Sequence, residues 1–347
     1  MSVISKLADA ISPNGPSNAA TIGRDGLIRP SIYDRHHFRT LGAAVAIVVA
    51  IPLFVSGIYG MGVATSCGLF AILSLGFYYQ FALSGQFSFA TSGFYGIGAF
   101  TSIWASKDFG FVGGILAAVV VCAIIGAFLK VLLARSPLIQ FGIATLSATS
   151  LAIIVLRNWD SLSGSGAGKF GVKPVSLFGR DFTSPTEQYY AVWAVALIGI
   201  FLLILFERSA ARRDLVFARD MGAVARTSGL KTGPIFIVAF AIGAGYMGAA
   251  GSLFAHTNRF AQIDSFTIVI SLDVLLMVLL GGTASVWGPP LGAIALVIVP
   301  EYLRSVPELR DLVFAGIILL VILVLPGGLA SIPSRVQQVV AKRRRTV

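Results

Sequence analysis

The sequence alternates between long apolar runs and short polar segments, and this pattern continues from about residue 41 almost to the end of the chain. Most runs are close to 20 residues long, the length at which an α-helix crosses the hydrocarbon core of a bilayer. The pattern predicts about ten transmembrane helices, at 41–59, 61–83, 87–105, 111–134, 138–156, 189–206, 232–255, 266–282, 286–303 and 312–326. We therefore expect an all-α, polytopic membrane protein.

The composition agrees with this fold class and excludes several others. Of the 347 residues, 56% are hydrophobic and 12% are charged, which is about half the charged fraction of a soluble domain. The net charge of +11 could indicate nucleic-acid binding, but the charges stand at the ends of apolar runs and are not interleaved with aromatic residues. Cys67 and Cys122 both lie inside apolar runs, so we expect neither a disulfide framework nor a metal cluster.

The distribution of Lys and Arg predicts the orientation in the membrane. Most of the 26 basic residues fall in alternate polar segments, and basic residues favour the cytoplasmic side. We expect both termini in the cytoplasm. The domains follow in order: a cytoplasmic tail over 1–40, a permease domain over 41–330 and a basic cytoplasmic tail over 331–347. Within the permease domain we expect an external loop at 157–188 and a cytoplasmic segment at 207–231.

The cytoplasmic segment has the pattern of a short amphipathic helix. Arg212, Arg219 and Arg226 are seven residues apart and would share one face of it. Small residues would line another face, which suits close docking against a second protein: Ala218, Gly222, Ala225 and Gly229. We interpret the segment as the contact for an ATP-driven motor. The alternative is a basic loop that only fixes the topology.

Ser84, Ser88, Ser92 and Gly96 recur every four residues, which indicates a stripe for helix–helix packing. The alternative is a broken helix that lines a cavity, with Gln86 as the polar group inside it. A second stripe, Ala244, Gly248 and Ser252, lies in the run at 232–255.

Asp273 is the one ionisable residue well inside an apolar run, and Ser271 precedes it by two residues. An isolated charge there costs about 2.5–3.5 kcal/mol on insertion scales, so we expect it to face protein or water. It is either a pathway residue or a polar staple between helices. The same run ends in a glycine-rich segment that predicts a tight cytoplasmic hairpin, with residues Gly281, Gly282, Gly288, Pro289 and Gly292.

Enzyme chemistry finds no support in the pattern. There is no Ser-His-Asp arrangement and no metal-ligand spacing. SGSGAGKF at 163–170 is not a Walker A loop, because Phe170 stands where Ser or Thr must hold magnesium. Transport remains, by an ATP-driven permease or by an ion-coupled carrier that uses Asp273. A structural membrane subunit is a weaker third possibility.

Six segments, in order, resemble the permease subunits of branched-chain amino acid ABC transporters of the LivM type. They are LSGQFSFATSGFYGIGAF at 83–100, FGIATLS at 141–147, SGSGAG at 163–168, RDLVFARDMGAVARTSGL at 213–230, SLDVLLMVLLGGTASVWGPPLGA at 271–293 and PGGL at 326–329. The similarity spans roughly residues 60–330. The chain departs from the family pattern at Ser165, Gly222, Asp273 and Ala284, and the resemblance leaves the solute open among amino acids, urea, amides and organic or aromatic acids.

The resemblance implies an importer of the bacterial inner membrane that works by alternating access. Its partners would be a LivH-type permease, one or two cytoplasmic ATPases of the LivG/LivF type and a periplasmic solute-binding protein. ATP and magnesium would be bound by the ATPase, with no cofactor in this chain.

Together, the pattern and the resemblance assign three sets of site residues. The ATPase-docking set is Arg212, Arg213, Arg219, Asp220, Ala225, Arg226 and Gly229. The candidate pathway set is Gln86, Ser88, Ser92, Thr145, Ser271 and Asp273. The helix-packing or hinge set is Gly85, Gly96, Gly248, Gly281, Gly282, Gly288, Pro289 and Gly292.

Overall fold

The computed structural model describes residues 37–54, 57–164, 168–177, 180–302, 316 and 328–331. The N-terminal tail before residue 37, the basic tail beyond Ser331 and nearly all of the tenth expected run at 312–326 lie outside these residues. The chain divides into two units, 1–54 and 55–347, and each is described by itself. The first contains the apolar helix α2 (His37–Phe54).

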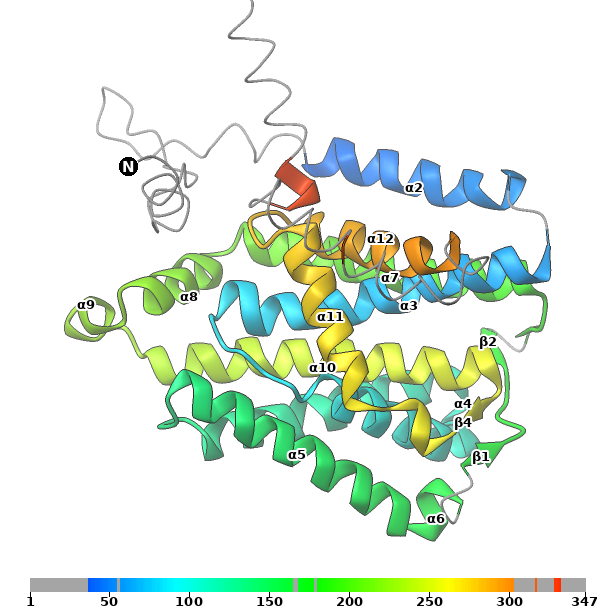
Figure 1. Cartoon of the computed structure of the whole chain (residues 1–347), viewed down its shortest axis with the longest axis horizontal. Helices are drawn as coiled ribbons and strands as arrows, with labels where there is room; N and C mark the ends of the chain where they lie inside the picture. Colours follow the sequence, from blue (N-terminus) through cyan, green and yellow to red (C-terminus); the bar gives the residue numbers. More distant parts are fainter. Residues whose placement is uncertain are drawn as a thin grey trace, which may run out of the picture. The chain divides into compact units, whose positions relative to one another are not determined.

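The second unit is a bundle of apolar helices (Figure 1). Six helical segments of the described chain are long and apolar enough to span a bilayer. They are α3 (Ile58–Tyr78) with the π-helix η2 (Tyr79–Leu83), α4 (Thr91–Leu132), α5 (Leu138–Asn158), α7 (Pro185–Glu207), α10 (Thr232–Asn258), and η3 (Ile263–Ser265) with α11 (Ile268–Gly281). The shorter helices are α6 (Asp160–Ser163), α8 (Ala210–Asp220), α9 (Gly222–Thr227), α12 (Gly288–Tyr302) and η5 (Leu329–Ser331). The expected all-α, polytopic fold class is confirmed.

Helix α4 corresponds to two of the predicted runs. Its 42 residues contain a break at Gly110, which has φ 67° and ψ −175°. Glycine adopts this backbone conformation without a steric penalty because it has no Cβ. The chain doubles back there, since Gly114 packs against Ser102, with an added Cβ only 2.8 Å from the Ser102 Oγ. Helix α4 is therefore a helical hairpin, and each of its two arms is long enough to span a membrane.

Small residues let the central helices approach closely. Helix α10 packs against α4 and α3, and a Cβ added at Gly98 of α4 would lie 2.5 Å from the Gly248 Cα of α10. A Cβ at Gly76 of α3 would lie 2.6 Å from the Gly243 carbonyl oxygen. In a bilayer, where lipid gives helices no hydrophobic reason to associate, such backbone proximity supplies the van der Waals contact that holds them together. Gly248 lies at this crossing, where the predicted small-residue stripe placed it.

Large apolar side chains cover the outside of the bundle. Phe128, Ile139 and Ile124 have exposed fractions of 68%, 77% and 63%. A soluble protein rarely exposes so many such residues together, whereas the lipid-facing surface of a membrane protein is expected to be apolar. The exposed surface therefore agrees with the hydropathy pattern.

The expected external loop at 157–188 contains short strands that the sequence pattern did not predict. Strand β1 (Lys169–Phe170) pairs antiparallel with β4 (Phe260–Ala261), and β2 (Val175–Leu177) pairs antiparallel with β3 (Arg180–Phe182). Helix α7 then begins at Pro185, where the Glu187 carboxylate accepts a hydrogen bond from the Ser184 N–H at 3.3 Å. These strands are only two or three residues long, so the fold class remains all-α.

A buried chain of hydrogen bonds ties this loop to the bundle. His256 Nδ1 lies 2.8 Å from the Lys173 carbonyl oxygen, and its Nε2 lies 3.0 Å from the Ser102 Oγ. The Ser102 Oγ lies 2.7 Å from the Ser252 Oγ. All three side chains are fully buried. Because a carbonyl can only accept, Nδ1 carries a proton; with a neutral imidazole, Nε2 then accepts from Ser102, and Ser102 accepts from Ser252.

Candidate functional site

The first part of the candidate site is a break between η2 and α4. Residues 84–90 are not helical, and α4 begins only at Thr91, several residues after the predicted start at 87. The extended segment leads from the end of η2 to the start of α4 (Figure 1). Ser84 and Ser88 lie in this segment and cannot share a helical stripe with Ser92 and Gly96, so the packing-stripe prediction is wrong. The broken helix is what the structure contains.

Local hydrogen bonds shape the start of the break. The Gln86 N–H donates to the Gln80 carbonyl oxygen at 2.8 Å, and the Gly85 N–H donates to that of Phe81 at 3.0 Å. The Ser84 hydroxyl also donates to the Gln80 carbonyl, at 2.6 Å. Gly85 has φ 67°, a left-handed conformation that turns the chain out of the helix. π-Helical turns such as η2 are often found at functional sites.

The end of the break is anchored at the Phe89 backbone by hydroxyl groups from two other helices. The Phe89 N–H donates to the Thr145 Oγ1 at 3.0 Å, and the Phe89 carbonyl accepts from Thr149 at 3.0 Å and from Ser271 at 2.9 Å. Ser271 in turn accepts from the Ser92 N–H at 3.0 Å. Non-helical backbone at membrane depth must be satisfied by protein or water. Here α5 and α11 satisfy it.

Four of the predicted pathway residues therefore come together around Phe89. Ser92, Thr145 and Ser271 make the bonds just described, and the Ser88 Oγ accepts from the Ala90 N–H at 3.2 Å. Thr149 belongs to the same cluster and was missed. The signal in the sequence was its position one helical turn after Thr145.

The two remaining predicted pathway residues, Gln86 and Asp273, are not part of this cluster. The Gln86 side chain is 8% exposed, and its Oε1 has no hydrogen-bond partner within the described residues. Asp273 is half-buried, and no hydrogen bond or ion pair to its carboxylate occurs in the described part of the chain. Buried polar groups are normally paired, so Gln86 is a candidate to meet a polar solute or water, as are Gln80 and Thr91 beside the break, whose Oε1 and Oγ1 also have no partner in the described residues.

A groove of about 710 Å³ lies between the two arms of α4 and α5. Its lining is almost entirely apolar, and Ala90, Gly93 and Thr149 form part of it beside the break. An apolar lining offers few partners to a polar solute. This groove is therefore not the route that a polar solute would take.

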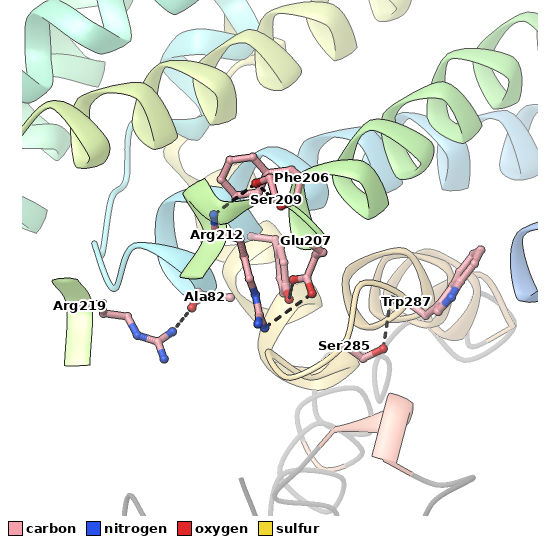
Figure 2. Close-up of polar contacts among 9 residues, drawn as sticks. Ala82, Phe206, Glu207, Ser209, Arg212, Arg219, Ser285 and Trp287 are labelled. Carbon is pink, nitrogen blue, oxygen red and sulfur yellow. Dashed lines mark hydrogen bonds and ion pairs between the residues drawn. The ribbon is translucent and has the colours of Figure 1, made fainter. Parts of the chain in front are cut away.

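The second part of the candidate site is the segment between α7 and α10. The predicted single helix is two helices, α8 and α9, separated at Met221. The Ser209 Oγ caps α8 by accepting from the Arg212 N–H at 3.3 Å. The Arg212 guanidinium pairs with Glu207 at 3.6 Å, and the Tyr78 hydroxyl of α3 donates to Glu207 at 3.2 Å. The start of α8 is thereby tied to α7 by the Arg212–Glu207 pair (Figure 2) and, through Tyr78, to α3.

Arg219 ties the end of α8 to the helix break. Its guanidinium donates to the Ala82 carbonyl oxygen in η2 and pairs with Asp220 at 2.7 Å (Figure 2). Its aliphatic stem lies against Gly85, where an added Cβ would be 2.9 Å from the Arg219 Cγ. Arg219 and Gly85, which were predicted for different roles, therefore belong to one contact.

The small-residue face of α8 and α9 packs against the rest of the chain. Ala225 and Leu215 are fully buried, and Ala218 is 4% exposed. The prediction that Ala225 lies on a docking surface is wrong, because its own chain covers it. Gly229 has φ 81° after the end of α9, so it ends the helix and does not line a helical face.

The outward surface of this segment combines apolar and basic groups. Phe217, Met221 and Val224 have exposed fractions of 38%, 58% and 52%. Arg213 and Arg226 are also exposed. We call these five residues the α8–α9 patch. An exposed apolar group rimmed by charges is typical of a protein interface. Sequence reasoning named the arginines and missed the three apolar residues.

The predicted hairpin between α11 and α12 is packed backbone against backbone. Gly281, Gly282, Gly288, Pro289 and Gly292 are all buried. A Cβ added at Gly292 would lie 2.8 Å from the Gly281 nitrogen, and one added at Gly328 would lie 2.7 Å from the Gly281 carbonyl carbon. Gly328, part of the PGGL motif, thus closes the hairpin.

Metal-binding geometry was not found in the described residues. No group of three His, Cys, Asp or Glu side chains in that part of the chain could hold an ion. Cys67 and Cys122 are buried free thiols. Burial in an apolar environment is the usual state of an inert structural cysteine.

The fold defines the class: this is a multi-pass helical membrane protein with a broken helix and a pair of short helices between α7 and α10. The model of the family "Branched-chain amino acid transport system / permease component" matches residues 41–323, and the chain belongs to this family. It is similar to the LivM permease protein of the high-affinity branched-chain amino acid transport system from Salmonella typhimurium, with 29% identity over 314 residues. The Escherichia coli LivM protein is 29% identical over 319 residues. Each alignment covers 83% of this chain and 74% of the relative. No solved structure gave a significant match.

Proposed function

We propose that the chain is the permease subunit of an ATP-binding-cassette importer in the bacterial inner membrane. In this proposal, α8 and α9 face the cytoplasm. The solute is a branched-chain amino acid or a related small polar organic compound. Family membership over most of the chain carries this proposal. The basic residues of the segment from Glu207 to Lys231 support the orientation.

The partners follow from the same assignment. A LivH-type permease completes the pathway, a periplasmic binding protein delivers the solute, and one or two LivG/LivF-type ATPases supply the energy. ATP and magnesium are bound by the ATPases, and this chain holds no cofactor. The α8–α9 patch is the surface that we assign to the ATPase, because it offers apolar anchors within a basic rim.

The break at 84–90 is where this chain meets the solute. Discontinuous helices in transporters place polar backbone and side chains at membrane depth, where a polar solute needs partners. Gln86 supplies an amide oxygen that has no partner in the described residues. Alternating access then requires the break to move when the ATPases close. Asp273 lies outside this cluster and serves as a secondary candidate.

The direct test is co-purification followed by reconstitution. The full chain, expressed together with tagged LivH-, LivG- and LivF-type subunits from the same genome, should purify with an ATPase. In proteoliposomes the complex should import radiolabelled leucine or a related solute only with internal ATP and binding protein. Transport by the chain alone, driven by a proton or sodium gradient, would instead identify an ion-coupled carrier that uses Asp273.

A further inference from the structure

We propose that Arg219 is a positioning residue that transmits movement of α8 to the helix break, and that it does not contact the ATPase. The inference rests on the proposed function. It reassigns a residue that the sequence placed on the docking surface, because its side chain is engaged with η2 and Gly85 of its own chain.

The first observation is how the carbonyl groups at the end of η2 are satisfied. The Gln80 carbonyl accepts from the Gln86 N–H and from the Ser84 hydroxyl, and the Phe81 carbonyl accepts from the Gly85 N–H. The Ala82 carbonyl accepts from the Arg219 guanidinium. The last carbonyls of a helix have no partner within it, and a cation is favoured at that end. Arg219 therefore caps the helix that precedes the break.

The second observation is the contact between the Arg219 stem and the turn itself. A Cβ at Gly85 would lie 2.9 Å from the Arg219 Cγ and 3.0 Å from its Cδ. Gly85 is the residue with φ 67° that redirects the chain. The same arginine thus contacts both a carbonyl in the last turn of η2 and the glycine at which the chain turns into the break.

The third observation is that the extended segment is fastened at its far end. Four residues after Gly85, the Phe89 backbone bonds to α5 through Thr145 and Thr149 and to α11 through Ser271. Only three residues separate Gly85 from Phe89, and fixed bond lengths limit how far apart the two can move. A displacement of Arg219 must therefore either pull on the Phe89 anchors or rotate the segment between them, which includes Gln86.

The fourth observation is that α8 is attached at both ends. Arg212 ties its start to Glu207, and through it to Tyr78, while Arg219 ties its end to η2 (Figure 2). The α8–α9 patch faces outward between and beyond these attachments. A force on the α8–α9 patch would therefore act on α3 through Arg212 and on the break through Arg219. Only the second attachment leads directly to the pathway residues.

The experiment uses the assembled complex with Arg219→Ala in this chain. We expect the ATPases to co-purify at the wild-type level and ATP hydrolysis to stay within about twofold, whereas solute uptake falls at least about tenfold, a change within the usual range of coupling energies. Arg135→Ala is the matched control, because it removes another exposed arginine, one that makes no hydrogen bond or ion pair in the described part of the chain. It should leave uptake and hydrolysis unchanged.

A conservative variant keeps the test valid if the alanine protein does not fold. Arg219→Lys retains a cation and one donor but loses the planar fork. Its ratio of solute imported to ATP hydrolysed should lie below wild type and above Arg219→Ala where both are recovered. A wild-type ratio in the lysine variant would overturn the proposal.

A labelling measurement reads the movement directly. Cys67 and Cys122 are buried, so a Phe87→Cys substitution introduces one reporter thiol at a half-buried position of the segment at 84–90. Its rate of modification by a small methanethiosulfonate reagent should change on addition of ATP and vanadate. The added Arg219→Ala substitution should abolish that change. A change that persists in the double variant would overturn the proposal.

Two other outcomes distinguish a failure of this inference from a failure of the proposed function. Loss of the ATPases from Arg219→Ala on purification would show that Arg219 is a docking contact, which overturns the inference and leaves the proposed function intact. Failure of the wild-type chain to retain any ATPase would overturn the proposed function itself.

Discussion

Two of the non-helical connections between apolar helices in the described residues, at 84–90 and 282–287, are held in opposite ways. The segment at 84–90 is held by side-chain hydroxyl groups from α5 and α11 that bond to one backbone position, Phe89. The connection at 282–287 is held by glycines whose backbones touch, with Gly292 and Gly328 against Gly281. Hydrogen bonds to a hydroxyl can be exchanged as helices shift, whereas close-packed backbone has no alternative arrangement. We therefore expect the first connection to move during transport and the second to stay fixed.

The largest effect should come from adding a methyl group to the rigid connection. In Gly292→Ala the new Cβ would meet the Gly281 nitrogen and the Met277 carbonyl carbon, both 2.8 Å away. Backbone atoms cannot rotate aside, so we expect a loss of at least about 3 kcal/mol, the upper end of overpacking effects. The yield of monodisperse protein in detergent and its Tm measure this.

Gly62→Ala is the control for that substitution. A Cβ at Gly62 meets nothing within 4 Å, and Gly62 lies inside α3. Alanine is favoured over glycine in a helix by about 1 kcal/mol, so this variant should be at least as stable as wild type. Equal Tm values for Gly292→Ala and Gly62→Ala would contradict the close backbone packing that is argued to hold the connection at 282–287.

An intermediate effect should come from the movable connection. Ser271→Ala removes one of the two hydroxyl donors to the Phe89 carbonyl and the acceptor for the Ser92 N–H. Leaving a buried group unpaired costs about 1–3 kcal/mol, and we expect about 1–2 because Thr149 still donates. Uptake should fall more than the Tm suggests, since the anchor is lost. Ser147→Ala is the control, because its hydroxyl makes only an exposed bond within α5.

The smallest effect should come from removing a hydroxyl from the rigid connection. The Ser285 Oγ accepts from the Trp287 N–H at 3.3 Å in the turn before α12 (Figure 2). Ser285 is half-buried, so water can replace the bond. Ser285→Ala should change stability by no more than about 0.5 kcal/mol. A loss as large as that of Ser271→Ala, measured by Tm, would show that hydroxyl groups hold both connections.

The sequence predicted what depends on local pattern. The apolar runs located α3, α5, α7 and α10 to within a few residues, because a span has a length fixed by the bilayer. The glycines of the α11–α12 hairpin were also recognisable, since close helix packing needs small residues. The two runs that make up α4 were separated correctly around Gly110.

The sequence could not predict which face each short element turns toward its neighbours. The spacing of Ala218 and Ala225 identified a small-residue face, but it did not say that α10 of the same chain covers it. The four-residue repeat from Ser84 to Gly96 suggested a helix, whereas Phe89 gains its partners from residues 56 to 182 positions away. Such long-range bonds override the local preference for helix.

The row formed by Ser252, Ser102, His256 and the Lys173 carbonyl has one further consequence. Every bond in it must be oriented in the same sense, since the final carbonyl offers no hydrogen. Replacing any one side chain by an apolar residue leaves a neighbouring polar group without its hydrogen-bond partner. These three positions should therefore behave as one unit: single replacements will each cost nearly as much as replacing all three together.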